Sequence, residues 1–363
     1  MPVMKKSMPL SICILLLLGF APLKSTSSAI QNTDFSAQKT IVDGVSVVRL
    51  VDSKRGIEAS ILPSVGNMAF ELKVHGKNIL FFPDVKLSDF QKKPMQYGIP
   101  FLAPWANRLD DAAFWANGKK YTFNLGLGNI RTDGQNLPMH GLLSNAPWQV
   151  TDVGADEKSA HVTCRFEFWK QPDLMAQWPF AHEYEMTYRL TDGALEVKTT
   201  VTNLSSEAMP VVLGFHPYYR IPDIPRDEWI LRMPAAQAVV ADNRHIPTGE
   251  YKPNDLPNPL PLKGHTLDDG FTDLARNSMN QAVFSIESGE KKIELVFGPL
   301  YPVAVIWETA SPPGRSFDFI CIEPMAGPTN ATNLKGSKSV FFPQTVPSNG
   351  KWSESFWIRP KGI

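Results

Sequence analysis

A glutamate near the C-terminus has the sequence setting of a general base. On a strand over Phe317–Glu323, Phe319, Cys321 and Glu323 point to one face, and the isoleucines between them point to the other. A carboxylate at the end of an apolar face is costly to bury, and burial raises its pKa and makes it a stronger base when ionised. The alternative interpretation is that Glu323 is hydrated at the mouth of the strand.

A histidine in an aromatic segment could exchange protons near neutral pH. His216 is followed by Pro217, Tyr218 and Tyr219, which would hold its ring in one orientation. An imidazole has a reference pKa of about 6.5, so it can donate or accept a proton near neutrality. A packed turn residue is the alternative interpretation, and it applies equally to His140, which precedes a glycine.

Several other kinds of catalytic site lack their sequence motifs. The sequence contains no glycine-rich phosphate loop, no G-x-S-x-G nucleophile elbow and no paired cysteine or histidine spacing for a metal. His182 precedes Glu183 without the second histidine of a zinc-protease motif, so we interpret it as a strand residue beside a solvated neighbour. Two more polar clusters interrupt apolar settings, at Pro104–Arg108 and Pro138–Gly141.

Strands are expected to position these residues. Phe180–Leu190 and Ala194–Thr202 alternate apolar and polar residues on either side of the turn Thr191–Gly193, which is typical of a β-hairpin. With 31 prolines and 24 glycines between short strands, and no amphipathic helix longer than about two turns, the sequence predicts an all-β antiparallel sandwich or barrel. The other expected strands are Val47–Val51, Trp148–Val153, His161–Phe168, Ile230–Met233, Ala282–Ile286, Ile293–Phe297, Val303–Trp307 and Phe317–Glu323.

The N-terminus has the order of a secretory signal peptide. Lys5 and Lys6 precede the apolar run Met8–Leu18, and small polar residues follow up to Ala29. We therefore predict a signal peptide over residues 1–29 and export to the periplasm or the medium, with a retained N-terminal anchor as the alternative. Cys13 lies inside the apolar run, so a lipid anchor is not expected, and neither is a membrane association after cleavage.

Residues 30–363 are expected to form one domain. The proline-rich stretch Tyr251–Pro261 is interpreted as a long loop of one sandwich, and the alternative is a linker between two domains. The 36 basic and 36 acidic residues balance without a basic run, so a nucleic-acid partner is not indicated. Cys164 and Cys321 could pair only if the fold brings them together, and both are expected to be small buried residues.

The polar clusters together resemble the aldose 1-epimerase (galactose mutarotase) family, from about Val47 to Pro360. The resemblance rests on several short elements in the family order rather than on any one of them. They are Asn107-Arg108 with Phe114, Asn117-Gly118 and Tyr121; Met139-His140-Gly141 with Trp148; Trp178-Pro179-Phe180; Tyr188-Arg189-Leu190; Asn203; Met209-Pro210; His216-Pro217-Tyr218-Tyr219; Asp268-Asp269-Gly270-Phe271; and Cys321-Ile322-Glu323-Pro324.

The resemblance implies a galactose mutarotase-like β-supersandwich that exchanges the anomers of a free aldohexose without a cofactor or metal, as a monomer or homodimer. In the family, the matching histidine is the general acid and the matching glutamate is the general base, which implies these roles for His216 and Glu323. We expect the two to flank the sugar ring from opposite sides. The residues implied to bind sugar hydroxyls are Asn107, Arg108, His140, Tyr218 and Asp268.

Three positions depart from the family pattern. Ala112 stands near the place of a glycine, and Trp307 stands where many members have tyrosine. Ile306 stands where sugar-binding members often have glutamine. The contacts at the far end of the substrate, and with them the identity of the sugar, are therefore open.

Other functions are compatible with the same residues. A carbohydrate-binding protein without catalysis could use Trp105, Trp115, Trp148 and Trp178 as aromatic faces, although each could instead pack in the core. An accessory domain of a lyase or hydrolase ranks last, because the chain has no room for a separate catalytic domain. An epimerase of phosphorylated hexoses would need converging basic residues, for which the candidates are Arg131, Arg165 and Arg315.

Overall fold

Antiparallel strands dominate the computed structural model, which describes residues 1–3, 34–308, 318–334 and 343–363. The predicted hairpin is formed by β11 (His182–Thr191) and β12 (Ala194–Asn203), along which buried and more exposed residues alternate. Asp192 and Gly193 join the two strands with φ angles of 48° and 74°, and such a pair of positive φ angles belongs to the type I′ turn that suits the twist of a hairpin.

The hairpin lies within a nine-stranded sheet of order β19-β16-β21-β22-β26-β12-β11-β10-β9. The other strands of this sheet are β19 (Leu260–Pro261), β16 (Ile230–Arg232), β21 (Ala282–Ser288), β22 (Lys291–Phe297), β26 (Lys351–Lys361), β10 (Ser159–Glu167) and β9 (Gln149–Ala155).

A second sheet has the order β18-β17-β20-β23-β24-β14-β6, and β15 also pairs with β24. Its strands are β18 (Pro247–Pro253), β17 (Ala235–Ala241), β20 (Leu267–Leu274), β23 (Val303–Glu308), β24 (Ile320–Met325), β14 (Gly214–Phe215), β6 (Phe101–Leu102) and β15 (Tyr218–Tyr219). The proline-rich stretch connects β18 of this sheet with β19 of the nine-stranded sheet.

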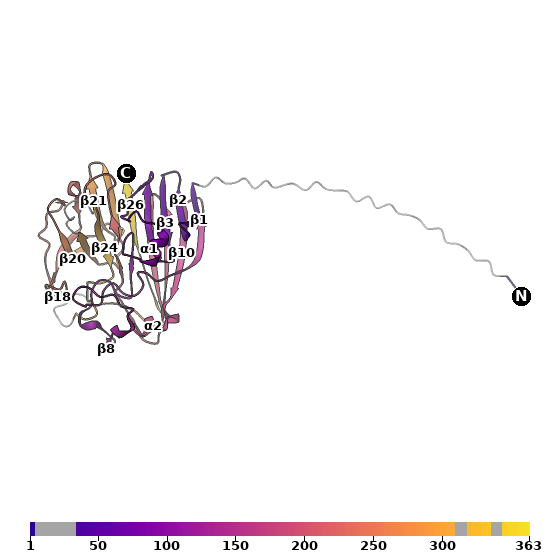
Figure 1. Cartoon of the computed structure of the whole chain (residues 1–363), viewed down its shortest axis with the longest axis horizontal. Helices are drawn as coiled ribbons and strands as arrows, with labels where there is room; N and C mark the ends of the chain where they lie inside the picture. Colours follow the sequence, from indigo (N-terminus) through magenta and orange to yellow (C-terminus); the bar gives the residue numbers. More distant parts are fainter. Residues whose placement is uncertain (4–33, 309–317, 335–342) are drawn as a thin grey trace. The chain divides into compact units, whose positions relative to one another are not determined.

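A five-stranded sheet extends the sandwich at the other end, where β1 and β2 contact β9, β10 and β11. Its strands are β1 (Phe35–Val42), β2 (Val45–Asp52), β3 (Ile57–Leu62), β4 (Met68–Val74) and β5 (Lys77–Asn78). In Figure 1, β1, β2, β3 and β10 lie on one side of this part of the chain, and β18, β20 and β21 lie on the other.

Short elements complete the described residues, and none of the described helices is long and apolar enough to cross a membrane. The sheets and the few short helices confirm the predicted all-β fold. Two small sheets pair β13 (Met209–Val211) with β25 (Gln344–Val346) and β7 (Ala113–Ala116) with β8 (Lys119–Thr122). The helices are α1 (Leu87–Lys92) and α2 (Pro172–Met175), with 3-10 turns η1 (Asp110–Ala112), η2 (Leu125–Leu127), η3 (Phe168–Lys170) and η4 (Arg226–Glu228).

Aromatic contacts between the two large sheets form the centre of the core. The Phe215 ring of β14 lies 4.9 Å from the Phe356 ring of β26, and the Phe101 ring of β6 lies 5.3 Å from that of Tyr184 on β11. One face of the second sheet is thereby buried against the nine-stranded sheet. Residues on its other face belong to separate, smaller clusters.

Three of the four tryptophans considered as sugar-binding faces are buried core residues. They are Trp105, Trp148 and Trp178, and only Trp115 is exposed. The signal peptide predicted over residues 1–29 lies outside the described residues, except for residues 1–3. Of the predicted strand over Phe317–Glu323, Phe317 also lies outside them, and the strand begins at Ile320.

Replacing Trp178 is expected to destabilise the sandwich. Its ring stacks on Phe114 at 4.0 Å and is fully buried, so Trp178→Ala removes a large packed side chain and leaves a cavity. The free energy of unfolding should fall by about 3–5 kcal/mol, measured by denaturant titration. Trp169→Ala is the matched control, because that ring is 44% exposed and contacts the Lys170 ammonium, and it should cost less than about 1 kcal/mol. Equal losses from the two variants would contradict the expectation.

Candidate active site

Strand register brings His216 and Glu323 together. The short strands β14 and β15 both pair with β24 in the antiparallel sense, through Gly214 with Met325 and Tyr218 with Cys321. His216 lies midway between Gly214 and Tyr218, and Glu323 lies midway between their partners Met325 and Cys321 on β24. The two segments, more than 100 residues apart in sequence, therefore place the imidazole beside the carboxylate.

The two side chains are in direct contact. His216 Nε2 lies 3.3 Å from Glu323 Oε1, and the side chains are only 9% and 1% exposed. Burial rules out the interpretation of Glu323 as a hydrated residue. The expectation that acid and base flank a sugar ring from opposite sides is wrong for this geometry. The reason is that the C1 hydroxyl oxygen and the ring oxygen are bonded to the same carbon, so the groups that serve them have to be neighbours.

Successive side chains of β24 point to opposite faces of the sheet, which determines the face from which Glu323 projects. Ile320 and Ile322 belong to the main core, whereas Cys321 belongs to a separate cluster with Tyr218. On the neighbouring β23, Val305 lies opposite Glu323. The carboxylate thus projects from the sheet face that is turned away from the core.

Aromatic neighbours hold the His216 ring. The Tyr218 ring stacks on it at 4.9 Å with an interplanar angle of 19°, and the rings of His140 and Trp307 meet it edge-on at 5.3 and 5.6 Å. Its backbone N–H donates to the Pro100 carbonyl at 3.0 Å. The imidazole is therefore fixed by packing on several sides.

The clusters at Pro104–Arg108 and Pro138–Gly141 lie side by side. Arg108 forms a β-bridge with Met139, and the N–H of His140 donates to the carbonyl of Asn107 at 3.0 Å. Asn107 and His140 adopt φ angles of 56° and 63°, in the left-handed region that is uncommon outside glycine.

Gly141 explains why a glycine follows His140. Its φ is 67°, and a Cβ at this position would lie 2.2 Å from the carbonyl oxygen of Ala103. Only glycine permits this close approach of the two backbones.

One carboxylate and one amide orient the guanidinium of Arg108. Its Nε donates to Asp133 Oδ2 at 2.9 Å, and its Nη1 donates to Asn107 Oδ1 at 3.2 Å. Asp133 in turn accepts backbone N–H groups of Gln135 and Leu137, which lowers the pKa of its carboxyl although burial opposes this. An ionised Asp133 thus fixes a guanidinium beside the site.

Asp268 reaches the site from β20, where it lies opposite Trp307 of β23. Its Oδ2 is 3.4 Å from Nδ1 of His245. Partial burial raises its pKa, and the charges of His245 and Arg108 act in the opposite direction.

One cavity of about 200 Å³ collects all seven residues singled out in the sequence. It combines an acid–base pair with a ring of hydrogen-bonding groups, on a scale that suits one monosaccharide. The lining residues are Asn107, Arg108, His140, His216, Tyr218, Asp268 and Glu323, together with Gln96, Arg131, Met139 and Trp307.

Burial dominates the protonation of the acid–base pair. It raises the pKa of Glu323 well above the usual value, the charge of Asp268 raises it further, and Arg108 opposes this. Burial lowers the pKa of His216 to about 3, and it lowers that of His140 well below the ordinary value, with contributions from His216, Arg131 and Arg108. Burial therefore favours the uncharged form of both side chains, in which the one acidic proton that His216 and Glu323 share is on the carboxyl group.

Sequence reasoning missed Gln96 and Asp133 as site residues. Both lie in loops without a periodic pattern, and the only available signal for Asp133 was that a buried Arg108 would need a counter-charge. Trp307 was noted only as a departure from the family pattern, yet it lines the cavity. Ile306 is fully buried in the core, so the residues of β23 that face the site side are Val305 and Trp307.

Of the three arginines considered for a phosphate, the two that the structure describes do not converge. Arg131 lines the cavity, whereas Arg165 pairs at 3.9 Å with Glu185 on the exposed side of β10 and β11, and Arg315 lies outside the described residues. Cys164 and Cys321 are both buried and unpaired. Within the described ranges, no group of three His, Cys, Asp or Glu residues is arranged to hold a metal ion.

Comparisons with known proteins match most of the chain. A model of the family described as aldose 1-epimerase matches residues 49–356. A galactose mutarotase-like protein from Clostridium acetobutylicum is 27% identical, with a TM-score of 0.79 over 91% of this chain and 99% of that protein.

More distant relatives resemble the fold or part of the sequence. A galactose 1-epimerase from Lactobacillus acidophilus NCFM has a TM-score of 0.67 at 15% identity over 91% of this chain and 99% of that one, a likeness of fold alone. The uncharacterized protein YihR of Escherichia coli K12 is 25% identical over 167 residues, which span 46% of this chain and only half of YihR.

Proposed function

Because the chain belongs to the aldose 1-epimerase family, we propose that it interconverts the α and β anomers of a free aldohexose by acid–base opening and closure of the ring. The observation that carries the proposal is the contact of the His216 imidazole and the Glu323 carboxylate, 3.3 Å apart, in a cavity of monosaccharide size. Two oxygens on one carbon have to exchange protons in this reaction, and the pair supplies one group for each.

Glu323 acts as the base and His216 as the acid in the proposed ring opening. The carboxylate takes the proton of the C1 hydroxyl, the imidazolium gives its proton to the ring oxygen, and the bond between C1 and the ring oxygen breaks. The open-chain aldehyde rotates about C1–C2. In ring closure, the 5-hydroxyl returns its proton to His216 while the carbonyl oxygen takes the proton from Glu323.

Sugar binding prepares the pair for these roles. A C1 hydroxyl that donates to the carboxylate stabilises its ionised form, and a ring oxygen that accepts from the imidazolium stabilises the charged histidine. Both contacts favour transfer of the shared proton from Oε1 to Nε2, which are already adjacent. Arg108, His140 and Asp268 orient the ring by hydrogen bonds, and this orientation contributes to the rate.

Polarimetry on freshly dissolved α-D-glucose and α-D-galactose tests the proposed function. The protein should accelerate the approach to the anomeric equilibrium above the spontaneous rate, and absence of acceleration for every aldose tested would refute the proposal. Parallel rates on glucose and glucose 6-phosphate distinguish it from an epimerase of phosphorylated hexoses. Sugar binding in calorimetry without acceleration would instead select a carbohydrate-binding protein.

Asp268→Asn is expected to move the alkaline limb of the pH profile to lower pH. The pair loses its shared proton as the pH rises through the raised pKa of Glu323, and activity falls with it. Asp268 raises that pKa through its negative charge, so its removal lowers the pKa and the proton is lost earlier. The measurement is kcat/KM against pH with the spontaneous rate subtracted.

The control for this variant is the surface substitution Asp152→Asn, whose carboxylate pairs with His161 at 2.8 Å, outside the cavity. It should leave the alkaline limb in place. An Asp268→Asn profile that coincides with the wild-type limb, or moves to higher pH, would contradict the assignment of the shared proton.

A further inference from the structure

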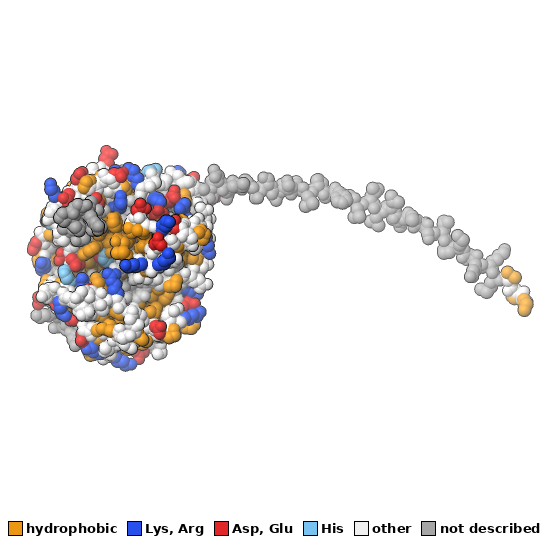
Figure 2. Space-filling view, in the orientation of Figure 1, with side chains coloured by type: hydrophobic (Ala, Val, Ile, Leu, Met, Phe, Trp, Pro, Cys, Tyr) orange, Lys and Arg blue, Asp and Glu red, His pale blue; other side chains and the backbone are white. Residues whose placement is uncertain are grey.

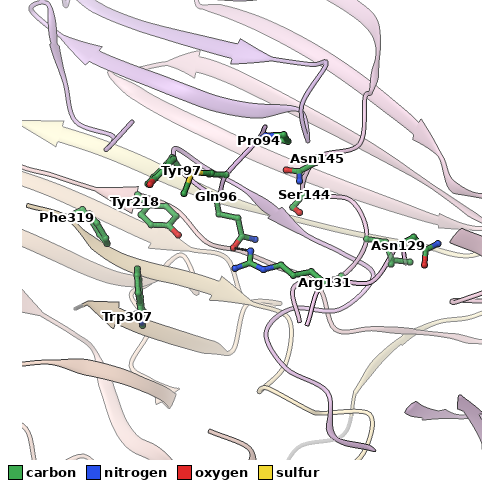
Figure 3. A pocket seen from close by; sticks show the side chains of 13 residues that line it. Pro94, Gln96, Tyr97, Asn129, Arg131, Ser144, Asn145, Tyr218, Trp307 and Phe319 are labelled. Carbon is green, nitrogen blue, oxygen red and sulfur yellow. Dashed lines mark hydrogen bonds between the residues drawn. The ribbon is translucent and has the colours of Figure 1, made fainter. Parts of the chain in front are cut away.

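The monosaccharide cavity adjoins a larger pocket of about 650 Å³. Gln96, Arg131, Tyr218 and Trp307 line both spaces, so they form the boundary between an inner cavity and an outer pocket. Figure 3 shows the Tyr218 hydroxyl, Gln96 and Arg131 meeting at this boundary. The outer pocket has more than three times the volume of the space that holds the acid–base pair.

One wall of the outer pocket is aromatic. The rings of Trp307 and Phe319 stack at 5.6 Å, and the Tyr97 ring lies 5.7 Å from that of Tyr218. Figure 2 shows hydrophobic side chains gathered in the middle of one face of the described chain, with basic side chains beside them. Aromatic faces of this kind pack against the apolar C–H faces of sugar rings.

The rest of the described lining is uncharged apart from Arg131, and it is mixed in polarity. Pro94, Met95 and Leu142 are apolar, Ser144 and Asn145 supply a hydroxyl and an amide, and Gln96 lies at the boundary. The described lining residues include one charged side chain, Arg131, and no carboxylate. A pocket with an aromatic wall and neutral hydrogen-bonding groups suits a neutral polyhydroxylated ligand better than an ionic one.

A hydrogen bond joins two of the residues at the boundary. Arg131 Nη1 donates to Gln96 Oε1, which leaves the other donors of the guanidinium available to groups on either side. A ligand that spans the boundary can therefore take hydrogen bonds from Arg131 with both of its parts.

We propose that the outer pocket is a subsite for a second glycosyl residue, so that the preferred substrate is a neutral disaccharide with a free reducing end. This inference rests on the proposed function and narrows its substrate class. The reducing residue occupies the inner cavity against His216 and Glu323, and the second residue packs on the wall formed by Trp307 and Phe319. A monosaccharide fills the inner cavity alone and leaves this wall unused.

The test compares glucose with four disaccharides of glucose that differ in linkage, namely maltose, cellobiose, laminaribiose and isomaltose. For the wild-type protein, kcat/KM for at least one disaccharide should exceed that for glucose, by about tenfold if the second residue contributes about 1.4 kcal/mol. Asn145→Trp fills the outer pocket without touching the inner cavity. Asn145→Trp should abolish the higher kcat/KM for the disaccharide and leave kcat/KM for glucose within about twofold of the wild-type value. Asn145→Ala should leave kcat/KM for the disaccharide and for glucose unchanged.

Two results would overturn the subsite. One is that no disaccharide exceeds glucose in the wild-type protein, and the other is that Asn145→Trp leaves the ratio of disaccharide to glucose unchanged. Failure of the proposed function is distinct, because then no sugar shows accelerated anomer exchange. In that event calorimetry with the same sugars decides: tighter binding of a disaccharide than of glucose, lost in Asn145→Trp, supports the subsite, and equal binding overturns it.

Discussion

Glu323→Gln is expected to slow catalysed anomer exchange by about 10²–10⁴-fold, the usual contribution of a positioned acid or base. The amide has the shape of the protonated carboxyl group but does not accept the C1 proton. Glu323 is 1% exposed and burial raises its pKa well above the usual value, which favours the protonated carboxyl group over a buried charge. The neutral amide fits the same space, so the free energy of unfolding should change by only about 1 kcal/mol.

The rate is measured by polarimetry and by NMR exchange between the anomeric protons, with unfolding curves recorded on the same samples. Glu185→Gln is the control, because this carboxylate lies on β11 near Arg165, outside the cavity, and its replacement should leave the rate unchanged. A folded Glu323→Gln protein that equilibrates anomers as fast as the wild type would refute the assignment of the base.

The sequence predicted the local features of the fold well. The alternation in β11 and β12 and the turn at Asp192 and Gly193 depend on neighbouring residues, and the hairpin is found where expected. The two faces of β24 are also local, because alternation separates Ile322 from Glu323 regardless of what the strand packs against.

Long-range pairing was the part that local patterns did not contain. β14 and β15 are two residues long, and nothing in their own sequence specifies that both pair with β24. In the sequence, only the resemblance to a known family links His216 with Glu323. The contact distance of 3.3 Å, and hence the adjacent arrangement of acid and base, depends entirely on this non-local register.

Local sequence also does not predict which loop residues and which tryptophans lie at the site. Gln96 and Asp133 belong to segments without periodicity, and their roles come from partners far along the chain, such as Arg108. Trp105 and Trp178 differ from Trp307 in burial rather than in residue type, so composition alone does not show which ring lines the cavity of His216 and Glu323. The signal peptide remains a prediction.

His216→Asn is expected to cost about as much as Glu323→Gln, again about 10²–10⁴-fold in rate, because the ring oxygen then leaves without a proton donor. The double variant should be no slower than about the slower single variant. In the proposed mechanism, the two side chains, 3.3 Å apart, exchange one proton and serve two oxygens on the same carbon, so neither should contribute much to the rate without the other. Groups that act as such a unit give strongly non-additive losses.

The measurement is a double-mutant cycle on the catalysed rate, with His161→Asn combined with Glu323→Gln as the matched cycle. His161 pairs with Asp152 at 2.8 Å and does not line the inner cavity, so any effect it has should multiply with that of Glu323→Gln rather than saturate. If the losses from His216→Asn and Glu323→Gln instead multiply, the two groups act independently. In that case a shared proton is not the basis of the mechanism, because a shared proton would make the effect of each substitution on the rate depend on whether the other group is present.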